Sequence, residues 1–482
     1  MSEQELPFIF ARNNQVAIDG DTLLVGPDAT MNGLREARRV ARRPLTPQIL
    51  PEAEFHAALV RLFNVPVEQG DASDVAFDLE ALDRPSATRD LLEDATEAPV
   101  IRLVNQLLRQ AVQARASDLH MEPHEDGLRV RMRVDGTMQK ILDRQDVPAR
   151  RVVSRLKVMA DLDIAETRLP QDGRMALRLG GRAIDVRLSS LPGHYGERVV
   201  MRLLDRTSGL MGLHQLGLQE ADETKLHRLA ALPNGIILAT GPTGSGKTTT
   251  LYSLLRLANR AERNILTIED PVEYDLPGVS QTQVNAEIGL TFAKGLRSIL
   301  RQDPDVILVG EIRDPETAHV ACEAALTGHL VFSSLHANNA LSAVVRMREL
   351  GVDAYLISST LRGVVAQRLL RRVCSTCRRA ASLTEKAAAL FTQAGLDVPR
   401  QLYEAAGCDR CQNTGFDGRT GAFDILEIDD TLRQAIDAGV SETQMRQLSG
   451  APVSGLFAAG LRIAALGETT LDEVCRVIGE TA

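Results

Sequence analysis

A glycine-rich segment near the middle of the chain carries the clearest chemical signal in the sequence. It follows a strand-like apolar run over residues 235–240 and fits the pattern G-x-x-x-x-G-K-S/T. Glycines in this pattern let successive backbone N–H groups turn toward a phosphate at a helix N-terminus, where aligned peptide dipoles favour negative charge. The eight residues are Gly241, Pro242, Thr243, Gly244, Ser245, Gly246, Lys247 and Thr248. We expect a nucleotide site in which Lys247 contacts the β- and γ-phosphates and Thr248 is a ligand of Mg²⁺.

Two further strand-like runs end in carboxylates. One covers residues 264–270 and includes Glu269, and the other covers residues 305–311 and ends in Glu311. The carboxyl ends of parallel strands meet at the ligand edge of a sheet, so these acids should lie beside the phosphate loop. Hydrolysis needs one acid near the metal and another that orients water. We expect Glu269 to polarise the water and Glu311 to lie on the metal side, with the reverse assignment open. Gly310 stands where many P-loop proteins have an Asp.

Two histidines, His329 and His336, flank the next β-like run. Either imidazole could sense the γ-phosphate. A histidine taken alone is more often structural or solvated, so both candidates depend on the family resemblance described below.

Four of the six cysteines form two C-x-x-C pairs. Doubled pairs of this kind favour a closed tetrathiolate zinc site over a redox disulfide, although redox chemistry is the alternative. The 30-residue stretch between the pairs is longer than a usual zinc ribbon, and a helix-like run over residues 386–394 indicates a hairpin-like excursion tied at its base by the metal. The predicted ligands are Cys374, Cys377, Cys408 and Cys411.

The composition indicates a modular protein in a reducing compartment. With 482 residues, the chain exceeds what one hydrophobic core normally organises. Its 55 basic against 64 acidic residues, and aromatic residues at 3%, disfavour a protein that mainly neutralises nucleic-acid phosphates. Because the N-terminus is acidic and no apolar run could span a bilayer, we expect a cytoplasmic protein that reaches the membrane through partners.

Five segments follow from the patterns along the chain. Strand runs over residues 128–134, 184–188 and 198–203 carry Arg at alternate positions, so one face of their sheet presents guanidinium groups to anions. Alternating strands and helices up to about residue 370 predict a parallel sheet. The expected segments are a small α/β module over 1–68, an acidic flexible linker over 69–97, an α+β domain over 98–206, a connector over 207–220, and an ATPase domain over 221–482 that includes a cysteine module at 372–412 and C-terminal helices.

From about Pro99 to Ala482 the chain resembles the secretion ATPases of type II export and type IV pilus assembly. The short N-terminal module and its opening residues 6–12 are more similar to the type II members, the general secretion protein E family. The resemblance implies a RecA-like, doubly wound P-loop domain preceded by a PAS-like domain, and six subunits in a ring. It rests on five blocks: GPTGSGKT at 241, TIEDPVEY at 267, LRQDPDVILVGEIRD at 300, TGHLVFSSLHANNA at 327, and the paired cysteines.

The resemblance also gives roles to arginines. Arg187 and Arg202 match family positions that reach nucleotide phosphates from the PAS-like domain. Arg297, Arg301 and Arg419 match further functional arginines. A planar guanidinium can engage phosphate oxygens bidentately and stabilise charge on the γ-phosphate. Without this match, an arginine-rich strand face would be explained by surface solvation.

The resemblance implies a hexameric motor of type II secretion in which hydrolysis of ATP rotates the two domains and drives pseudopilus assembly and protein export. ATP, Mg²⁺ and Zn²⁺ are the implied ligands. The implied partners are the cytoplasmic domain of the secretion L protein and the inner-membrane F protein, with acidic phospholipid as an optional partner and attachment to the cytoplasmic face of the inner membrane. Three alternatives stay open: a pilus-extension ATPase, a nucleic-acid motor, and a nucleotide sensor without hydrolysis.

Overall fold

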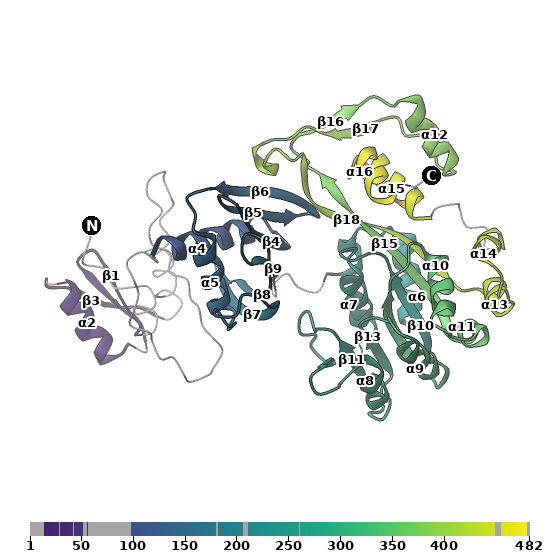
Figure 1. The fold of residues 1–482 in the computed structure, drawn as a ribbon, viewed down its shortest axis with the longest axis horizontal. Coiled ribbons are helices and arrows are strands. Elements are labelled where there is room, and N and C mark those ends of the chain that lie inside the picture. Colours follow the sequence, from purple (N-terminus) through teal and green to yellow (C-terminus); the bar gives the residue numbers. More distant parts are fainter. Residues whose placement is uncertain are drawn as a thin grey trace. The chain divides into compact units, whose positions relative to one another are not determined.

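The computed structural model of the chain describes residues 14–27, 29–41, 43–51, 55, 98–179, 182–205, 211–259, 261–448 and 455–479. The opening residues 6–12 and the expected acidic linker over 69–97 lie outside the described residues. The chain divides into two compact units, Met1–Ala76 and Phe77–Ala482. Figure 1 shows the elements of both units in chain order by colour.

The described residues of the N-terminal unit include a three-stranded sheet and helix α2. β1 (Val16–Asp19) and β2 (Thr22–Val25) form an antiparallel hairpin, and β3 (Thr46–Ile49) pairs with β2 in parallel after helix α2 (Met31–Ala41). Ala37 of the helix packs with Val16 and Leu23 of the hairpin. The structure confirms the predicted small α/β module, in which the described apolar residues form two small clusters.

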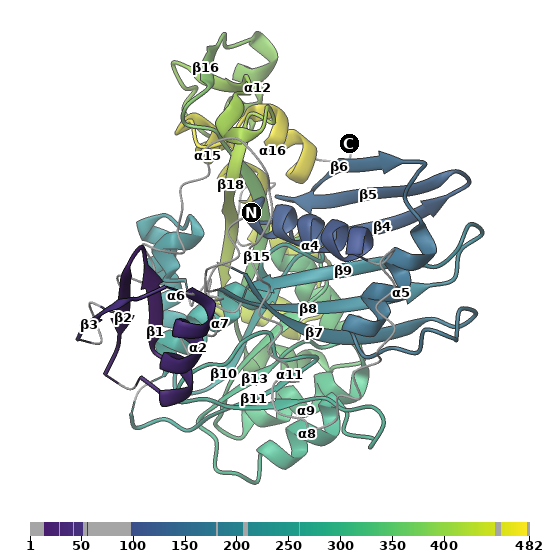
Figure 2. The same cartoon turned by 90° about the vertical axis from the view of Figure 1, so that its left-hand side faces the viewer.

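The second unit begins with an antiparallel sheet covered by two helices (Figure 2). Its strand order is β6-β5-β4-β9-β8-β7, and apolar side chains from alternate strand positions pack against α4 and α5. This part is the predicted α+β domain. Its elements are α4 (Ala98–Gln113), β4 (Asp118–His124), β5 (Gly127–Val134), β6 (Thr137–Arg144), α5 (Ala149–Met159), β7 (Gln171–Leu179), β8 (Arg182–Leu191) and β9 (Arg198–Asp205).

The other face of this sheet carries arginines and acids side by side. Glu122 lies between Arg131 and Arg198, with N···O distances of 2.7 and 2.9 Å. Asp118 on the same strand pairs with Arg202 at 3.2 Å. The sequence predicts that this arginine face binds anions. In this structure the nearest anions are the carboxylates of a neighbouring strand, so part of the positive charge is already neutralised.

The ATPase domain is built on a seven-stranded sheet, in the order β12-β11-β13-β14-β10-β15-β18. Figure 1 shows helices α7 to α11 packed around this sheet. All neighbours pair in parallel except β15 and β18, which are antiparallel. The strands are β10 (Gly235–Thr240), β11 (Ile265–Glu269), β12 (Ser280–Gln283), β13 (Val306–Val309), β14 (Leu330–Leu335), β15 (Leu361–Val373) and β18 (Phe416–Glu427). The helices that precede or connect these strands are η1 (Leu213–Leu216), α6 (Glu220–Ala230), α7 (Lys247–Ala258), α8 (Phe292–Ile299), α9 (Pro315–Leu326), α10 (Ala340–Glu349) and α11 (Ala354–Thr360).

Both faces of this sheet are buried. Ile236 and Leu238 of β10 point into a core formed with α8 to α11, whereas Ile237 and Ala239 point into a second core formed with α6 and α7. A strand buried on both faces reads as a continuous apolar run, which explains the pattern over residues 235–240. The structure confirms the predicted doubly wound, mostly parallel sheet.

The long strands β15 and β18 carry the cysteine module and the C-terminal helices. Between them, β16 (Arg378–Ala381) and β17 (Leu402–Ala405) form an antiparallel pair around α12 (Glu385–Gln393), which is the predicted hairpin-like excursion. None of the helices in the described part of the chain is long and apolar enough to cross a bilayer. The remaining elements are η2 (Asp409–Cys411), α13 (Asp430–Asp437), α14 (Glu442–Leu448), α15 (Gly455–Ala465) and α16 (Leu471–Ile478).

Candidate active site

The glycine-rich loop joins the carboxyl end of β10 to the first turn of α7. Gly241 and Gly246 have φ angles of +150° and +89°, in the region that favours glycine. A Cβ at Gly241 would also lie 2.6 Å from the Gln367 carbonyl oxygen of β15, so a side chain there would clash with backbone. Gln367 supports the loop directly, because its Nε2 donates to the Ser245 carbonyl oxygen at 2.8 Å. The loop is therefore held against β15 at both Gly241 and Ser245.

Lys247 lies over this loop with neutral partners. Its Nζ donates to the carbonyl oxygens of Gly241 and Pro242, at 2.8 and 3.0 Å. Burial lowers the pKa of Lys247, the Glu311 carboxylate opposes that shift, and the Arg368 guanidinium adds to it. The oxygens of a bound triphosphate would give this ammonium anionic hydrogen-bond acceptors in place of the two neutral carbonyl oxygens.

The residues of the loop fit a phosphate and a hard cation. The Ser245 hydroxyl oxygen is buried and has no hydrogen-bond partner among the described residues, so it has an unused donor at the loop. The Thr248 side chain is exposed on the first turn of α7, where its hydroxyl would hold Mg²⁺. Bound there, the cation would neutralise charge on the phosphates.

Glu311, which follows β13, connects the loop to His336 at the end of β14. Its carboxylate forms an ion pair with Arg313, and its Oε2 lies 3.8 Å from the Nε2 of His336. Burial and the charge of Lys247 lower the pKa of His336, while the Glu311 charge opposes them. Beside the loop, a cavity of ≈590 Å³ is lined by loop residues, His336 and side chains of α10. The structure thus brings the loop, Glu311 and His336 together.

Glu269 ends β11 and is almost completely buried, with 3% of its surface exposed. Its Oε1 accepts hydrogen bonds from the Thr267 hydroxyl at 2.5 Å and from the Gln281 side chain at 3.1 Å. Its Oε2 accepts a hydrogen bond from the Tyr252 hydroxyl. Glu269 is therefore held by protein donors, whereas Glu311 lies among charged groups. The choice between the two acids stays a prediction.

His329 lies where β14 begins, at the end of the strand that is away from the phosphate loop. β10 and β14 are parallel and in register from Gly235 opposite Leu330 to Thr240 opposite Leu335, and the Gly235 N–H donates to the His329 carbonyl. The six strand residues between His329 and His336 separate the two by about 20 Å. Only His336 is brought to the phosphate loop of the same chain.

Each predicted arginine contacts protein groups in this structure. Arg187 donates to Glu273 in the loop after β11 at 2.9 Å, and Arg202 donates to Asp118 at 3.2 Å. Their roles stay predictions. The contacts of the other three are Arg297 to Glu316 at 2.5 Å, Arg301 to the Arg297 carbonyl oxygen at 2.8 Å, and Arg419 to Asp135 at 3.2 Å.

Several residues at the site were not predicted from the sequence. Arg313 could have been found from its place in the GEIRD run, two residues after Glu311. Tyr252 stands four residues after Thr248, a spacing that points both side chains to one face of α7. Gln367 and Arg368 of β15 had no signal, because their relevance depends on β15 lying beside β10.

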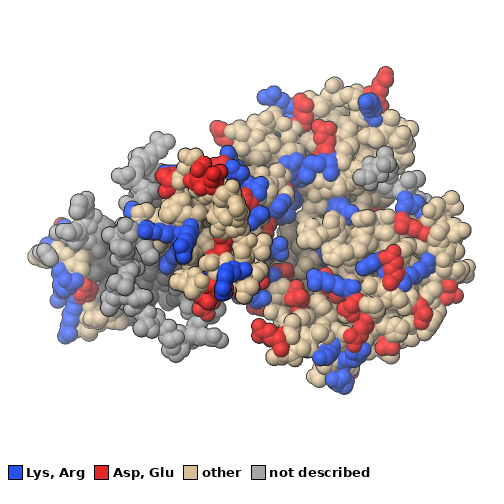
Figure 3. Space-filling view, viewed as in Figure 1, with Lys and Arg blue, Asp and Glu red and all other residues tan. Residues whose placement is uncertain are grey.

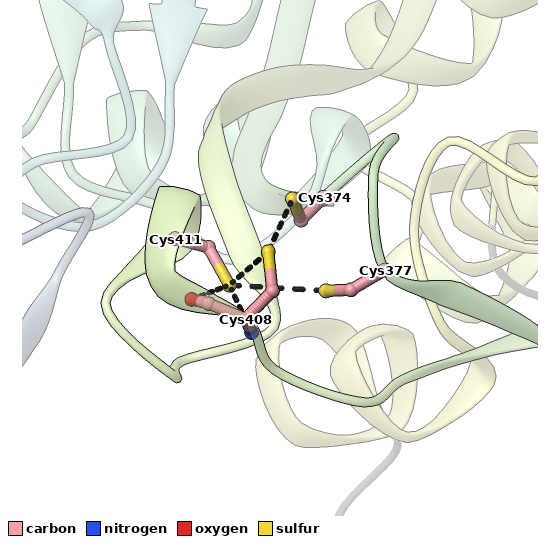
Figure 4. A group of neighbouring side chains, drawn as sticks. All are labelled: Cys374, Cys377, Cys408 and Cys411. Carbon is pink, nitrogen blue, oxygen red and sulfur yellow. Dashed lines mark hydrogen bonds between the residues drawn. The ribbon is translucent and has the colours of Figure 1, made fainter.

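The four predicted cysteines meet in space (Figure 4). Sulfur atoms of three pairs are 3.7–3.9 Å apart, close to the ~3.8 Å expected for a tetrahedral zinc site with Zn–S bonds of about 2.3 Å. Burial would raise the pKa of Cys411, but the N–H groups of Cys408 and Gly415 donate to its sulfur and the pKa falls to about 6. The sulfur set fits zinc, which would tie the base of the excursion.

Comparisons with known proteins agree with this geometry. The family model described as "Type II/IV secretion system protein" matches residues 93–476, and a model for a domain of "GSPII protein E" matches residues 5–63. The chain is 48% identical to the type II secretion system protein E of Dickeya dadantii, over 98% of this chain and 97% of that protein. It is 44% identical to the type II secretion system ATPase E of Vibrio cholerae, over 100% and 98%.

Solved structures show the same fold at low identity. The pilus retraction motor PilT with bound ADP matches with a TM-score of 0.53 and 24% identity, over 78% of this chain and 96% of that one. The Legionella pneumophila ATPase DotB matches with a TM-score of 0.57 and 21% identity, over 77% and 94%.

Proposed function

Because this chain belongs to the type II/IV secretion system protein family, we propose that it is the motor that drives pseudopilus assembly and protein export in a type II secretion system. ATP hydrolysis and a place in type II secretion follow from the family and from full-length relatives at 44–48% identity. The match of residues 5–63 to a domain of GSPII protein E favours the type II branch over a pilus-extension motor.

The observation that carries this proposal is the meeting of Lys247, Glu311 and His336 at one edge of the sheet. The ammonium is half-buried and donates to two carbonyl oxygens of the loop, and a carboxylate and an imidazole lie within its electrostatic reach. A triphosphate in the loop would face all three groups, which is the arrangement that phosphoryl transfer to water requires.

The two acids take different roles in this proposal. Glu269 polarises the attacking water, since its position is held by three hydrogen-bond donors. Glu311 lies on the metal side, because its charge acts on Lys247 at the phosphate loop. Exchange of these roles is the alternative, and kinetics of the two glutamine variants separates them.

In this proposal, the domains move because two arginines exchange protein carboxylates for the γ-phosphate of ATP. Arg187 is paired with the Glu273 carboxylate, and Arg202 with Asp118. A γ-phosphate carries more charge than a carboxylate and accepts bidentate hydrogen bonds, so it competes for these guanidinium groups. Loss of the γ-phosphate on hydrolysis removes that attraction, and the PAS-like domain then rotates relative to the ATPase domain.

The motor works as a homohexamer at the cytoplasmic face of the inner membrane, with the L protein's cytoplasmic domain and the F protein as partners.

A motor that moves along nucleic acid is less consistent with the charge distribution on the surface. On the face drawn in Figure 3, basic and acidic side chains of the described residues are interspersed, unlike the continuous basic stripe of a nucleic-acid binder.

The test combines nucleotide binding with phosphate release. Lys247→Ala is expected to abolish turnover, because it removes the charge at the β- and γ-phosphates. Glu311→Gln is expected to bind ATP with nearly normal affinity and to hydrolyse it at least about 100-fold more slowly. Calorimetry measures the binding, and a steady-state phosphate assay on the full chain measures the rate.

A matched control is Lys386→Ala, which removes an exposed lysine of α12 in the cysteine module. It should leave binding and turnover unchanged. Full ATPase activity in Lys247→Ala or Glu311→Gln would show that the catalytic site lies elsewhere.

A further inference from the structure

The hydroxyl of Tyr252 is the hydrogen-bond donor to Oε2 of the buried Glu269 carboxylate. Tyr252 itself is fully buried, and its ring packs edge-on against Tyr274 with the ring centroids 4.7 Å apart. Burial and the charge of Glu269 raise the pKa of Tyr252. The phenol therefore stays protonated, and its O–H donates a hydrogen bond to the carboxylate. This contact joins α7 to the end of β11.

Tyr252 lies on the helix that begins at the phosphate loop. Thr248, the expected Mg²⁺ ligand, and Tyr252 are four residues apart in α7, so their side chains leave the same face one turn from each other. A shift of the loop on nucleotide binding would therefore move Tyr252 and, through its hydroxyl, the Glu269 carboxylate. The helix gives a rigid connection of about 6 Å between the two side chains.

Within the described part of the chain, the hydrogen bonds to Glu269 leave it one further acceptor position. An ionised carboxylate has about four lone-pair sites, two on each oxygen. Thr267 and Gln281 use both sites of Oε1, and Tyr252 uses one site of Oε2. The direction of the remaining site on Oε2 is consequently set by the hydrogen bond from Tyr252.

We propose that Tyr252 is a positioning residue for ATP hydrolysis, which aims the free lone pair of Glu269 at the attacking water and couples that aim to the phosphate loop. Tyr252 acts through Glu269 and need not touch the nucleotide. This inference rests on the role proposed above for Glu269.

Tyr252 also fixes the loop that follows Glu269. The Glu273 N–H donates to the Tyr252 hydroxyl oxygen at 3.4 Å, and the Glu273 carboxylate is the partner of Arg187. The charge of Glu269 acts on Tyr274 of this loop as well as on Tyr252. Tyr252 therefore contacts both Glu269 and the loop at Glu273, whose carboxylate binds Arg187.

The experiment is Tyr252→Phe in the full chain, which keeps the ring and removes only the hydroxyl. We expect kcat for Mg·ATP to fall about 10- to 100-fold, as for loss of a hydrogen bond to a charged group, while ATP affinity changes less than about twofold. The loss should appear in kcat and not in ATP affinity, because Tyr252 acts through Glu269 and not on the nucleotide. General loosening of the core would lower ATP affinity as well.

Tyr274→Phe is the matched control, since it removes the hydroxyl of the neighbouring ring and leaves the edge-on packing. It should have wild-type kcat and wild-type ATP affinity. The inference is overturned if Tyr252→Phe keeps wild-type kcat, or if it loses ATP affinity in proportion to kcat.

Glu269→Gln separates this inference from the proposed function. An active Glu269→Gln variant contradicts the role of Glu269 itself. An inactive Glu269→Gln with a fully active Tyr252→Phe contradicts only the positioning role. When both are impaired, the double variant should be no slower than Glu269→Gln alone, because the two groups act as one unit; additive losses would overturn the inference.

Discussion

Glu473→Gln is expected to loosen the attachment of the C-terminal helices to β15. Glu473 lies on α16 with a side chain that is 1% exposed, and its carboxylate accepts hydrogen bonds from two guanidinium groups. Those from Arg371 of β15 are 3.1 and 2.7 Å long, and those from Arg476 are 2.8 and 2.7 Å long. The Arg371 backbone N–H donates a fifth, at 3.2 Å. Glutamine keeps the shape of the side chain and removes its charge.

The expected size of the effect follows from the pKa of Glu473. Burial would raise this pKa, but the hydrogen bonds from Arg476 and Arg371 outweigh burial and hold it at about 2, against an ordinary value of 4.5. At about 1.4 kcal/mol per unit, the shift corresponds to ~3 kcal/mol of stabilisation. Breaking a buried ion pair by removing one partner typically costs about 3–5 kcal/mol, which agrees.

The pH dependence has a definite sign. The folded-state pKa lies below the unfolded one, so the stabilisation is complete above about pH 4.5 and is lost as the pH falls toward 2. The wild-type contact between α16 and β15 should weaken over that window. The Gln variant should show no such weakening.

Native-state hydrogen exchange of the amides in α16 is the appropriate assay, because a chain of several domains does not unfold in a single step. At pH 7 the opening free energy of α16 should fall by ~3 kcal/mol in Glu473→Gln. Glu468→Gln is the control: it breaks the Arg372–Glu468 pair, in which both side chains are exposed, and should cost less than about 1 kcal/mol. Equal small losses in the two variants would refute the reasoning.

Three further predictions concern other contacts. Lys157→Met removes the ammonium that pairs with Glu197 at 2.7 Å in a buried position, and should lower the opening free energy of α5 by ~3–5 kcal/mol in native-state hydrogen exchange; a double variant with Glu197→Gln should recover part of that loss, and a single variant as stable as the wild type would contradict it. Cys377→Ser should lower the bound zinc per chain, as measured by atomic emission, and expose residues 372–412 to proteolysis. Wild-type protein that is produced in the presence of zinc but binds none would rule this out. Arg187→Gln should reduce kcat about 10- to 1000-fold with little change in ADP affinity, and an unchanged kcat would remove Arg187 from the mechanism.

The sequence by itself determined the local chemistry of this protein. The phosphate loop, the acids that follow β11 and β13, and the paired cysteines are contiguous patterns whose meaning depends on backbone conformation over a few residues. The same holds for the strands at β5, β8 and β9 and for the strands at β10, β11 and β13, because the period of apolar residues reports which faces are buried. The strands of the ATPase domain are continuous apolar runs, and a parallel sheet with helices on both faces follows from them.

Only the tertiary structure decided which of these residues meet. His329 and His336 are equivalent candidates in the sequence, but the direction and register of β14 bring only His336 to the phosphate loop. The arginine face was expected to attract an external anion, whereas adjacent strands place Glu122 and Asp118 between the arginines. The role of Tyr252 depends on α7 packing beside the end of β11. Contacts of this kind join residues far apart in the chain, and they depend on strand order, register and packing, which no local pattern encodes.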